Sequence, residues 1–429
     1  MASASAAKPS PYRFVIETLL FLTYAVFGLS WIAITPLVGE LQAEFAITSA
    51  QLGMINTLVS AAKVVAPLLT GLLAVRIGLK KTILLGSLCI CFAAIAPFTS
   101  DFTLFLASRF VFGVGGAIVV TLLGPMVMQW FPKSEMPLIN AFNNVAVNTG
   151  IAVTLFTTVP LAAAVGWRNA LLVYALLSVS LMLAWAVLGR DHATMSAAGA
   201  ESAPSSVRYA DVWKMKETWI IALSFAGPLA LYLAFNTWLP KYYMEAFGMS
   251  KATASQFTGL FNLVGIPSAI VAGLLTKHFG LRRPFIIGAG VVMGFAAFGM
   301  FLSPNPVLIT VAAILLGASL FTYVSPLFTT PMELKGMTPQ HVSLMMGTVF
   351  SFAYLFSSLS PVLVGLMRDA TGSFVPAFAI WAVFSWVLAL GGLLLPETGP
   401  RGAASKSQEI LEATVPAASE AEEAALVKS

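Results

Sequence analysis

The sequence predicts an all-α membrane protein in which twelve membrane-spanning helices form two pseudo-symmetric six-helix halves. Three observations predict this fold: the composition, the number of long apolar stretches, and an internal repeat. Of the 429 residues, 58% are apolar and 10% are charged, whereas a soluble protein carries about 25% charged residues. This composition excludes a soluble enzyme. The basic residues lie beside apolar stretches rather than in one patch, which also excludes nucleic-acid binding.

The membrane spans follow from the lengths of the apolar stretches. A helix that crosses a bilayer needs roughly 20 apolar residues, because each residue adds about 1.5 Å along the helix axis. Twelve stretches are close to this length, and we predict spans at residues 14–38, 50–74, 82–100, 102–128, 138–163, 168–189, 217–239, 255–276, 284–302, 307–328, 342–366 and 374–395.

Two loops of similar sequence show that the chain contains a repeat. The loop after the second predicted span reads GLLAVRIGLKK (71–81), and the loop after the eighth reads GLLTKHFGLRR (273–283). Their glycine and basic positions are all shifted by 202 residues. Two halves with the same orientation imply a pseudo-two-fold axis along the membrane normal, with a binding site between the halves at mid-membrane.

The repeat and the charge distribution together predict the organisation of the chain. We expect an N-terminal segment (1–13), a first six-helix half (14–189), a linker (190–216), a second half (217–395) and a disordered tail (396–429). Lys and Arg concentrate in the loops of the cytoplasmic side. Seventeen of them lie on the side that holds both termini and four on the other, so both termini are predicted to be cytoplasmic.

The repeated loops resemble the loop motif of the major facilitator superfamily, and Arg109-x3-Gly113-x-Gly115 resembles the motif of its fourth span. A G-x3-D-x-T-G sequence that also recurs in that family ends at Gly372. The segments 237–250 and 331–340 are similar to the cyanate-permease-like branch, which handles organic or inorganic anions. The resemblance implies gating or coupling roles for Arg109, Gly71, Gly78, Lys80, Lys81, Gly273, Gly280, Arg282 and Arg283.

One departure from the family pattern affects the predicted gate. The acidic residue of the loop motif, which in the family helps to latch the two halves together on the cytoplasmic side, is replaced by Val75 in the first half and by Lys277 in the second. The latch is therefore in doubt here, and topology anchoring is an alternative role for the remaining basic residues.

Lys63 is the most informative residue within a predicted span. It lies 14 residues from Ser49 and 12 from Val75, so its ammonium group is about 20 Å from either end of the helix. A charge at that depth normally faces a cavity or the interior of the bundle. The equivalent position of the second half is Gly265, so the charge is one-sided. We predict a cation that contacts the substrate; the alternative is a structural lysine that carbonyls and hydroxyls satisfy.

Two other ionisable side chains fall within spans. Arg109 lies about 10 Å into the fourth span, where an architectural or gating role is expected before direct ligation, and Glu17 is expected at the cytoplasmic interface. No Asp, Glu or His occupies the middle of a predicted span, whereas exporters of cations and drugs usually carry an acid there. The predicted cavity therefore favours an anion.

Polar residues on helix faces complete the predicted site. Asn144 and Asn148 share one face of the fifth span, where they either hydrogen-bond a substrate or join helices. Asn262 and Tyr354 lie on polar faces of the eighth and eleventh spans. By resemblance, spans 1, 4, 7 and 10 line the cavity, which adds weight to Tyr24, Tyr232, Asn236 and Tyr323.

These residues predict a secondary active transporter, not an enzyme, that moves a small organic or inorganic anion by alternating access. The expected driving process is proton symport or anion exchange, and the expected location is the bacterial inner membrane, as a monomer in the lipid bilayer. No cofactor or metal is expected, since Cys89 and Cys91 fit neither a disulfide framework nor a metal site. The alternatives are an exporter of a drug or amphipathic metabolite and a non-transporting membrane sensor on a transporter fold.

Overall fold

The computed structural model describes residues 10–132, 135–191, 209–337, 339–399 and 401–402, and these residues form helices and their connections. Most of the predicted linker and nearly all of the predicted tail lie outside the described residues. The first half comprises α1 (Arg13–Ile32), η1 (Thr35–Leu37), α2 (Val38–Phe45), α3 (Ser49–Ile77), α4 (Leu79–Ile90), η2 (Cys91–Ile95), α5 (Phe102–Trp130), α6 (Met136–Val165) and α7 (Trp167–Leu188).

The second half begins with a short helix and repeats the pattern of long helices. It comprises α8 (Tyr209–Trp213), α9 (Lys216–Phe247), α10 (Lys251–Phe279), α11 (Arg283–Gly299), α12 (Pro306–Thr322), α13 (Val324–Glu333), α14 (Pro339–Ser357), α15 (Ser360–Thr371), α16 (Val375–Ser385) and α17 (Val387–Leu394).

The predicted all-α membrane fold is confirmed. Within the described part of the chain, nine helical segments are long and apolar enough to cross a membrane, and α11 is a shorter apolar helix. Five predicted spans consist of more than one helical piece, such as α1 with η1 in the first span and α14 with α15 in the eleventh. Proline explains two of these breaks, because Pro36 and Pro361 have no N–H to continue the helical hydrogen bonds.

The boundary of the seventh span differs from the prediction. The predicted span ends at residue 239, whereas α9 continues to Phe247 and includes Lys241, which the sequence had placed in a loop. Pro240 and Lys241 resemble a helix end in sequence. In the fold, Tyr242 and Tyr243 continue the helix and donate hydrogen bonds to the carbonyls of Phe301 (2.5 Å) and Met300 (2.7 Å).

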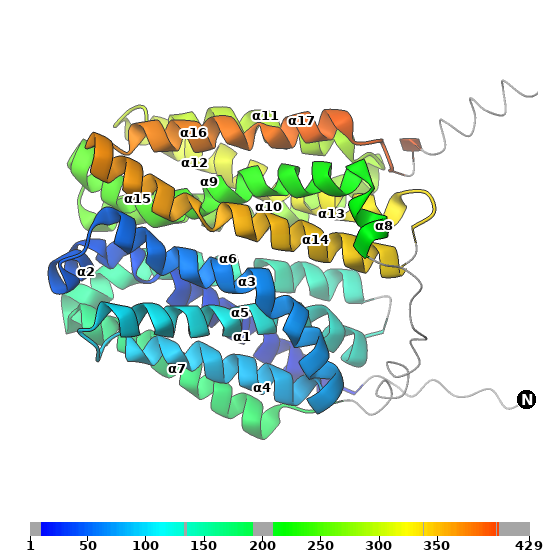
Figure 1. Ribbon diagram of the computed structural model, residues 1–429, viewed down its shortest axis with the longest axis horizontal. Coiled ribbons are helices and arrows are strands. Elements are labelled where there is room, and N and C mark those ends of the chain that lie inside the picture. The colour runs from blue at the N-terminus through cyan, green and yellow to red at the C-terminus, as the bar shows by residue number, and fades with distance from the viewer. Residues whose placement is uncertain (1–9, 133–134, 192–208, 338, 400, 403–429) are drawn as a thin grey trace, which may run out of the picture.

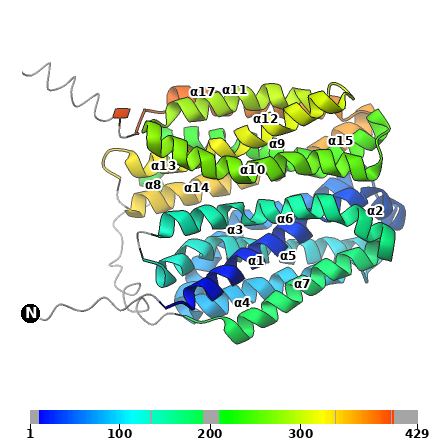
Figure 2. The same ribbon diagram turned by 180° about the vertical axis from the view of Figure 1, so that it is seen from behind.

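Helices α1–α7 form one bundle and α9–α17 form the other, with α3, α6, α10 and α14 at the boundary between them (Figure 1). The start of α1 and the end of α17 lie at the same end of the molecule, which we call the terminal end; the opposite end is the distal end (Figures 1 and 2). One cluster of buried apolar side chains lies almost wholly in the first bundle, whereas the larger cluster fills the second bundle and continues into the first through residues such as Leu37, Leu41 and Leu52.

The two halves touch closely at the distal end. A Cβ atom added to Gly53 of α3 would lie 2.5 Å from the carbonyl oxygen of Pro361, and one added to Gly365 of α15 would lie 2.5 Å from that of Ser49. Both positions therefore require glycine. These contacts place the first turns of α3 directly against α15, which closes the bundle on this side.

Candidate functional site

Lys63 lies in the middle of α3, with only 3% of its surface exposed. Its Nζ atom lies 4.0 Å from the ring centre of Trp31, 5.1 Å from that of Phe27 and 5.2 Å from that of Tyr354. We call these three rings the Lys63 cage. Their π faces stabilise a cation but accept no ordinary hydrogen bond from it.

The ammonium group of Lys63 has no counter-charge within the described part of the chain. Among the described residues, no carboxylate lies within 4.0 Å of Nζ, and no protein atom accepts a hydrogen bond from it. The Nζ atom of Lys63 also keeps some accessible surface, so it is not fully enclosed by protein. An ammonium carries three N–H donors, so all three are available to a ligand.

Glycines of α5 hold the cage in place. A Cβ atom added to Gly116 would lie 2.1 Å from the ring of Phe27, and one added to Gly113 would lie 2.7 Å from the carbonyl oxygen of Val59 in α3. Gly116 therefore leaves room for a ring of the cage, and Gly113 lets the helix that carries Lys63 pack closely. Gly113 belongs to the motif that begins at Arg109, and Gly116 directly follows that motif.

Three tyrosines extend the polar lining around Lys63. Within the described part of the chain, the hydroxyls of Tyr24, Tyr323 and Tyr354 make no hydrogen bond with protein, yet they keep some accessible surface. Tyr354 is close enough to interact electrostatically with Tyr24, Tyr232 and Tyr323. Four predicted tyrosines, three of them from α1, α9 and α14 and one from the junction of α12 and α13, therefore converge near the Lys63 cage.

A second group, which we call the amide cluster, consists of Asn148, Tyr232, Asn236 and Asn262. The Tyr232 hydroxyl lies 2.9 Å from Oδ1 of both Asn148 and Asn262, so two acceptors share its single proton. Asn262 donates from Nδ2 to Oδ1 of Asn236 at 2.8 Å, and Asn236 donates to the carbonyl of Tyr232 at 2.9 Å. This cluster joins α6 of the first half to α9 and α10 of the second.

The predicted site residues thus fall into two adjoining groups, the Lys63 cage with its tyrosines and the amide cluster. The backbone of Asn144 lies in α6, but its side chain is outside the described part of the structure. Phe27 is the residue that sequence reasoning missed, because it resembles an ordinary core side chain. Its position three residues after Tyr24 and four before Trp31, on one helix face, could have identified it.

The guanidinium group of Arg109 does not contact the ammonium group of Lys63. Its guanidinium group is 1% exposed and donates to the carbonyls of Ser30 (3.2 Å) and Trp31 (2.8 Å). These carbonyls belong to the last turn of α1, where helix ends leave such groups without partners. The observed contact agrees with the predicted architectural role, and it fixes the backbone of a residue whose ring covers Lys63.

The repeated loops at the terminal end make their contacts within their own halves. Gly78 and Gly280 end α3 and α10 with positive φ angles of 86° and 63°. The backbone N–H of Lys80 donates to Asp191 at 2.9 Å, and those of Arg282 and Arg283 donate to Glu397 at 2.8 and 3.1 Å. In each half, an acid that follows the last helix therefore holds the loop.

The side chains of these loops give a similar picture. Arg282 pairs with Glu333 at 2.8 Å, and Arg283 donates to the carbonyls of Gly392 and Leu393. A Cβ atom added to Gly71 or Gly273 would contact nothing within 4 Å. Their predicted role in gating stays a prediction, because the described contacts of these loops do not join the two halves.

The distal end carries polar contacts between the halves. Asp369 of α15 accepts hydrogen bonds from the backbone N–H groups of Ser49 (3.3 Å) and Ala50 (2.9 Å), at the start of α3. Lys251 of α10 pairs with Glu40 of α2. A carboxylate at a helix N-terminus satisfies free N–H groups and complements the helix dipole. The G-x3-D-x-T-G sequence contained this acid, but only the fold shows which helix it caps.

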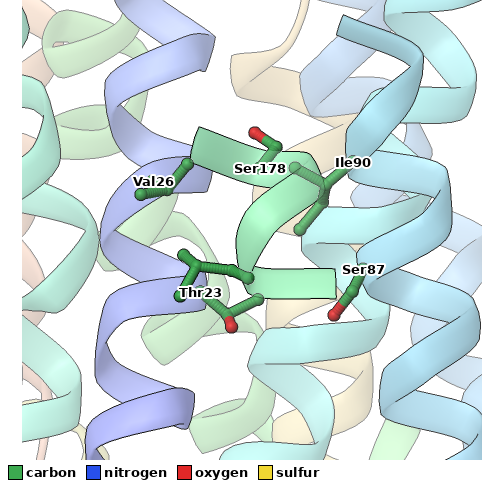
Figure 3. A pocket seen from close by; sticks show the side chains of 6 residues that line it. Thr23, Val26, Ser87, Ile90 and Ser178 are labelled. Carbon is green, nitrogen blue, oxygen red and sulfur yellow. The ribbon is translucent and has the colours of Figure 1, made fainter. Parts of the chain in front are cut away.

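A small recess between α1, α4 and α7 is lined by Thr23, Val26, Ser87, Ile90, Ser178 and Leu181 (Figure 3). It has no charged lining residue. Thr23 accepts a hydrogen bond from Trp185 Nε1 at 2.9 Å, and Ser87 and Ser178 donate to carbonyls of their own helices. Its polar groups therefore have partners, and the recess is not a candidate for substrate binding.

Comparisons with known proteins agree with this architecture. A sequence model of the Major Facilitator Superfamily matches residues 20–338. The protein named "Probable sulfoacetate transporter SauU" from Cupriavidus necator is 24% identical over 408 residues, covering 89% of this chain and 94% of its own. The 2-nitroimidazole transporter of Escherichia coli is 23% identical over 386 residues, covering 89% and 95%. The solved D-xylose–proton symporter shares the fold, with a TM-score of 0.72 at 13% identity over 90% of this chain and 99% of its own.

Proposed function

Because the chain belongs to the major facilitator superfamily of transporters, we propose that it is a secondary active transporter that moves a small anion across the membrane by alternating access. The observation that carries this proposal is the buried ammonium of Lys63, which faces the boundary between the halves and has no counter-charge among the residues that the structure describes. A bound anion would supply the missing charge and accept the three free N–H groups.

The energetics of burial support an anion as the ligand. A lysine near the centre of a membrane helix costs about 3 kcal/mol on insertion scales, and an unpaired charge in protein is also unfavourable. The cage reduces this cost only in part, since a cation–π contact contributes about 1–2 kcal/mol. An anion beside Nζ offsets the rest, while the hydroxyls of Tyr24, Tyr323 and Tyr354 donate hydrogen bonds to it.

The contacts between the halves support alternating access. The Asp369 cap on α3 and the pair between Lys251 and Glu40 join the halves at the distal end, and they must separate for the site to open there. The loops of the terminal end are tied within their own halves, so each half can move as a unit.

The location follows from the charge distribution. We place the terminal end in the cytoplasm and the protein in the bacterial inner membrane, because Lys and Arg concentrate at cytoplasmic loops. Similarity to a sulfoacetate transporter supports an anionic substrate, and the segments 237–250 and 331–340 support the cyanate-permease-like branch. Uptake would be driven by proton symport or by exchange with an internal anion.

Export of a drug or amphipathic metabolite is the second candidate. Similarity to the 2-nitroimidazole transporter favours an aromatic organic substrate, and the aromatic rings of the cage would pack against a flat organic ring. The unpaired Lys63 argues against it, because a neutral substrate leaves this charge without a partner.

The test is uptake into proteoliposomes that contain the full-length protein. A thermal-shift screen with nitrate, methanesulfonate, benzoate and sulfoacetate selects the anion, whose labelled form is then taken up with and without a pH gradient. We expect Lys63→Ala to reduce the initial rate at least about 30-fold. Lys214→Ala removes an exposed lysine at the terminal end and should leave uptake unchanged. Equal uptake by both variants would refute the anion site at Lys63, and stimulation by the pH gradient would distinguish symport from exchange.

A further inference from the structure

We propose that the site at Lys63 selects anions by their charge, accepting monovalent anions and rejecting divalent ones of similar size. This inference rests on the proposed function and narrows its substrate class. It predicts that sulfoacetate, which carries a sulfonate and a carboxylate and is therefore divalent at neutral pH, is rejected here, so similarity to a sulfoacetate transporter supports only the anionic class of the substrate. It follows from three features of the described structure: the number of cations at the site, the packing at the symmetry-related position, and the neutral character of the remaining lining.

Lys63 is the single cation at the site in the part of the chain that the structure describes. Arg109 is the other deeply buried cation, and its Nη1 and Nη2 atoms donate to the carbonyls of Ser30 and Trp31, which hold it at the end of α1. Every other described Lys and Arg lies within two turns of a helix end or in a connection. A second negative charge on a ligand would therefore find no cation at this depth.

The second half cannot supply a cation at the equivalent position. Gly265 of α10 corresponds to Lys63 of α3 in the 202-residue repeat. A Cβ atom added to Gly265 would lie 2.2 Å from Cε2 of Phe321 and 2.3 Å from its Cδ2. The ring of Phe321 thus fills the space that a side chain would need, and the one-sided charge is built into the packing.

The rest of the lining is neutral and, in part, unfavourable to an anion. Tyr24, Tyr323 and Tyr354 offer single hydroxyl donors, whereas most N–H and O–H donors of the amide cluster are engaged within protein. The ring faces that stabilise Lys63 carry partial negative charge, so they repel an anionic group that lies beyond reach of the ammonium.

Charge balance then determines selectivity. A monovalent anion and Lys63 form a neutral pair, which is tolerated in a medium of low dielectric constant. A divalent anion leaves one negative charge unpaired, and such a charge is strongly unfavourable there. We expect a monovalent anion to bind at least about tenfold more tightly than its divalent counterpart.

The test compares ligands that differ by one charge on the same skeleton. Binding of succinate and monomethyl succinate, and of sulfate and methanesulfonate, is measured by calorimetry on the purified full-length protein at pH 7.5 and constant ionic strength. We expect the monovalent member of each pair to bind at least about tenfold more tightly. Equal or tighter binding of the divalent members overturns charge selection but does not contradict the proposed anion transport. No binding of any anion overturns the anion proposal itself, and charge selection with it.

A variant separates charge selection from the stronger hydration of divalent anions. Tyr323→Lys adds a second cation beside Tyr354 but leaves the hydration of the ligands unchanged. If charge balance is the cause of the selectivity, the preference for the monovalent member should fall at least about threefold or reverse. An unchanged preference would assign the selectivity to hydration and refute the proposed cause. The wild-type comparison decides the main inference even where this variant does not fold.

Discussion

Helices α3 and α10 occupy equivalent places in the two halves, yet they contribute differently to the site. Both have 29 residues, both contain a proline (Pro67 and Pro267), and both end at a glycine with positive φ. At the mid-helix position where α3 carries Lys63, α10 carries Gly265. A symmetric scaffold therefore supports asymmetric chemistry, since helix length and helix ends are repeated while the charged side chain is not.

The largest expected effect comes from removing the asymmetry. Lys63→Met replaces the buried charge with an apolar side chain of similar length. We expect anion binding to fall at least about 30-fold, while the free energy of unfolding without ligand rises by about 1 kcal/mol or more, because an unpaired buried charge is lost. Calorimetry and thermal unfolding of the same samples measure both quantities. A variant that loses stability and binding together would indicate a structural lysine instead.

The next effect tests the packing that excludes a side chain from α10. Gly265→Ala forces a Cβ atom into the ring of Phe321, and overpacking of this kind costs about 1–3 kcal/mol in the free energy of unfolding. Gly273→Ala on the same helix is the matched control, because a Cβ atom there meets nothing within 4 Å. It should be neutral or stabilising by about 0.5–1 kcal/mol. Similar thermal unfolding of the two variants would contradict the packing argument.

The helix starts offer a third comparison. The first turn of α3 is capped from the other half by Asp369. We expect Asp369→Asn to weaken the closed distal end by about 1 kcal/mol, which increases the population of molecules open on that side. Spin labels at Ala43→Cys and Ala246→Cys, in a chain without its native cysteines, measure the distance between the halves, and a longer distance should become more populated.

A matched control separates closure from general stability. Asp101 caps α5 within its own half, through the N–H groups of Thr103 (2.7 Å) and Leu104 (3.1 Å). Asp101→Asn should lower the free energy of unfolding by a similar amount without changing the distance distribution. If both variants shift the distances alike, Asp369 acts only as a helix cap.

The smallest expected effect on binding concerns a single hydroxyl. Tyr354→Phe keeps the ring over Lys63 and removes one donor, so we expect anion affinity to fall about tenfold, the lower value for one hydrogen bond to a charged group. Tyr12→Phe removes a hydroxyl that donates to Leu188 at the terminal end and should not change affinity. An unchanged affinity in Tyr354→Phe would place the ligand away from this ring.

The sequence predicted the helices well because apolar length is a local property. Predicted spans and observed helices agree to within a few residues for α3, α5 and α6, whereas α9 runs eight residues further than predicted. That error arose at Pro240 and Lys241, whose local signals favour a helix end. Their neighbours Tyr242 and Tyr243 bond to Met300 and Phe301, a contact between distant segments that overrides the local preference.

Two properties of this protein were determined by the sequence alone: its place in a membrane and the depth of its one-sided cation. Both depend on composition and on spacing along a helix, which a sequence records directly. The tertiary structure decided what surrounds Lys63, because Trp31 and Tyr354 lie 323 residues apart in the chain and meet only when the halves pack. The tertiary structure also decided that position 265 has no room for a second cationic side chain, since the ring of Phe321 already occupies that volume.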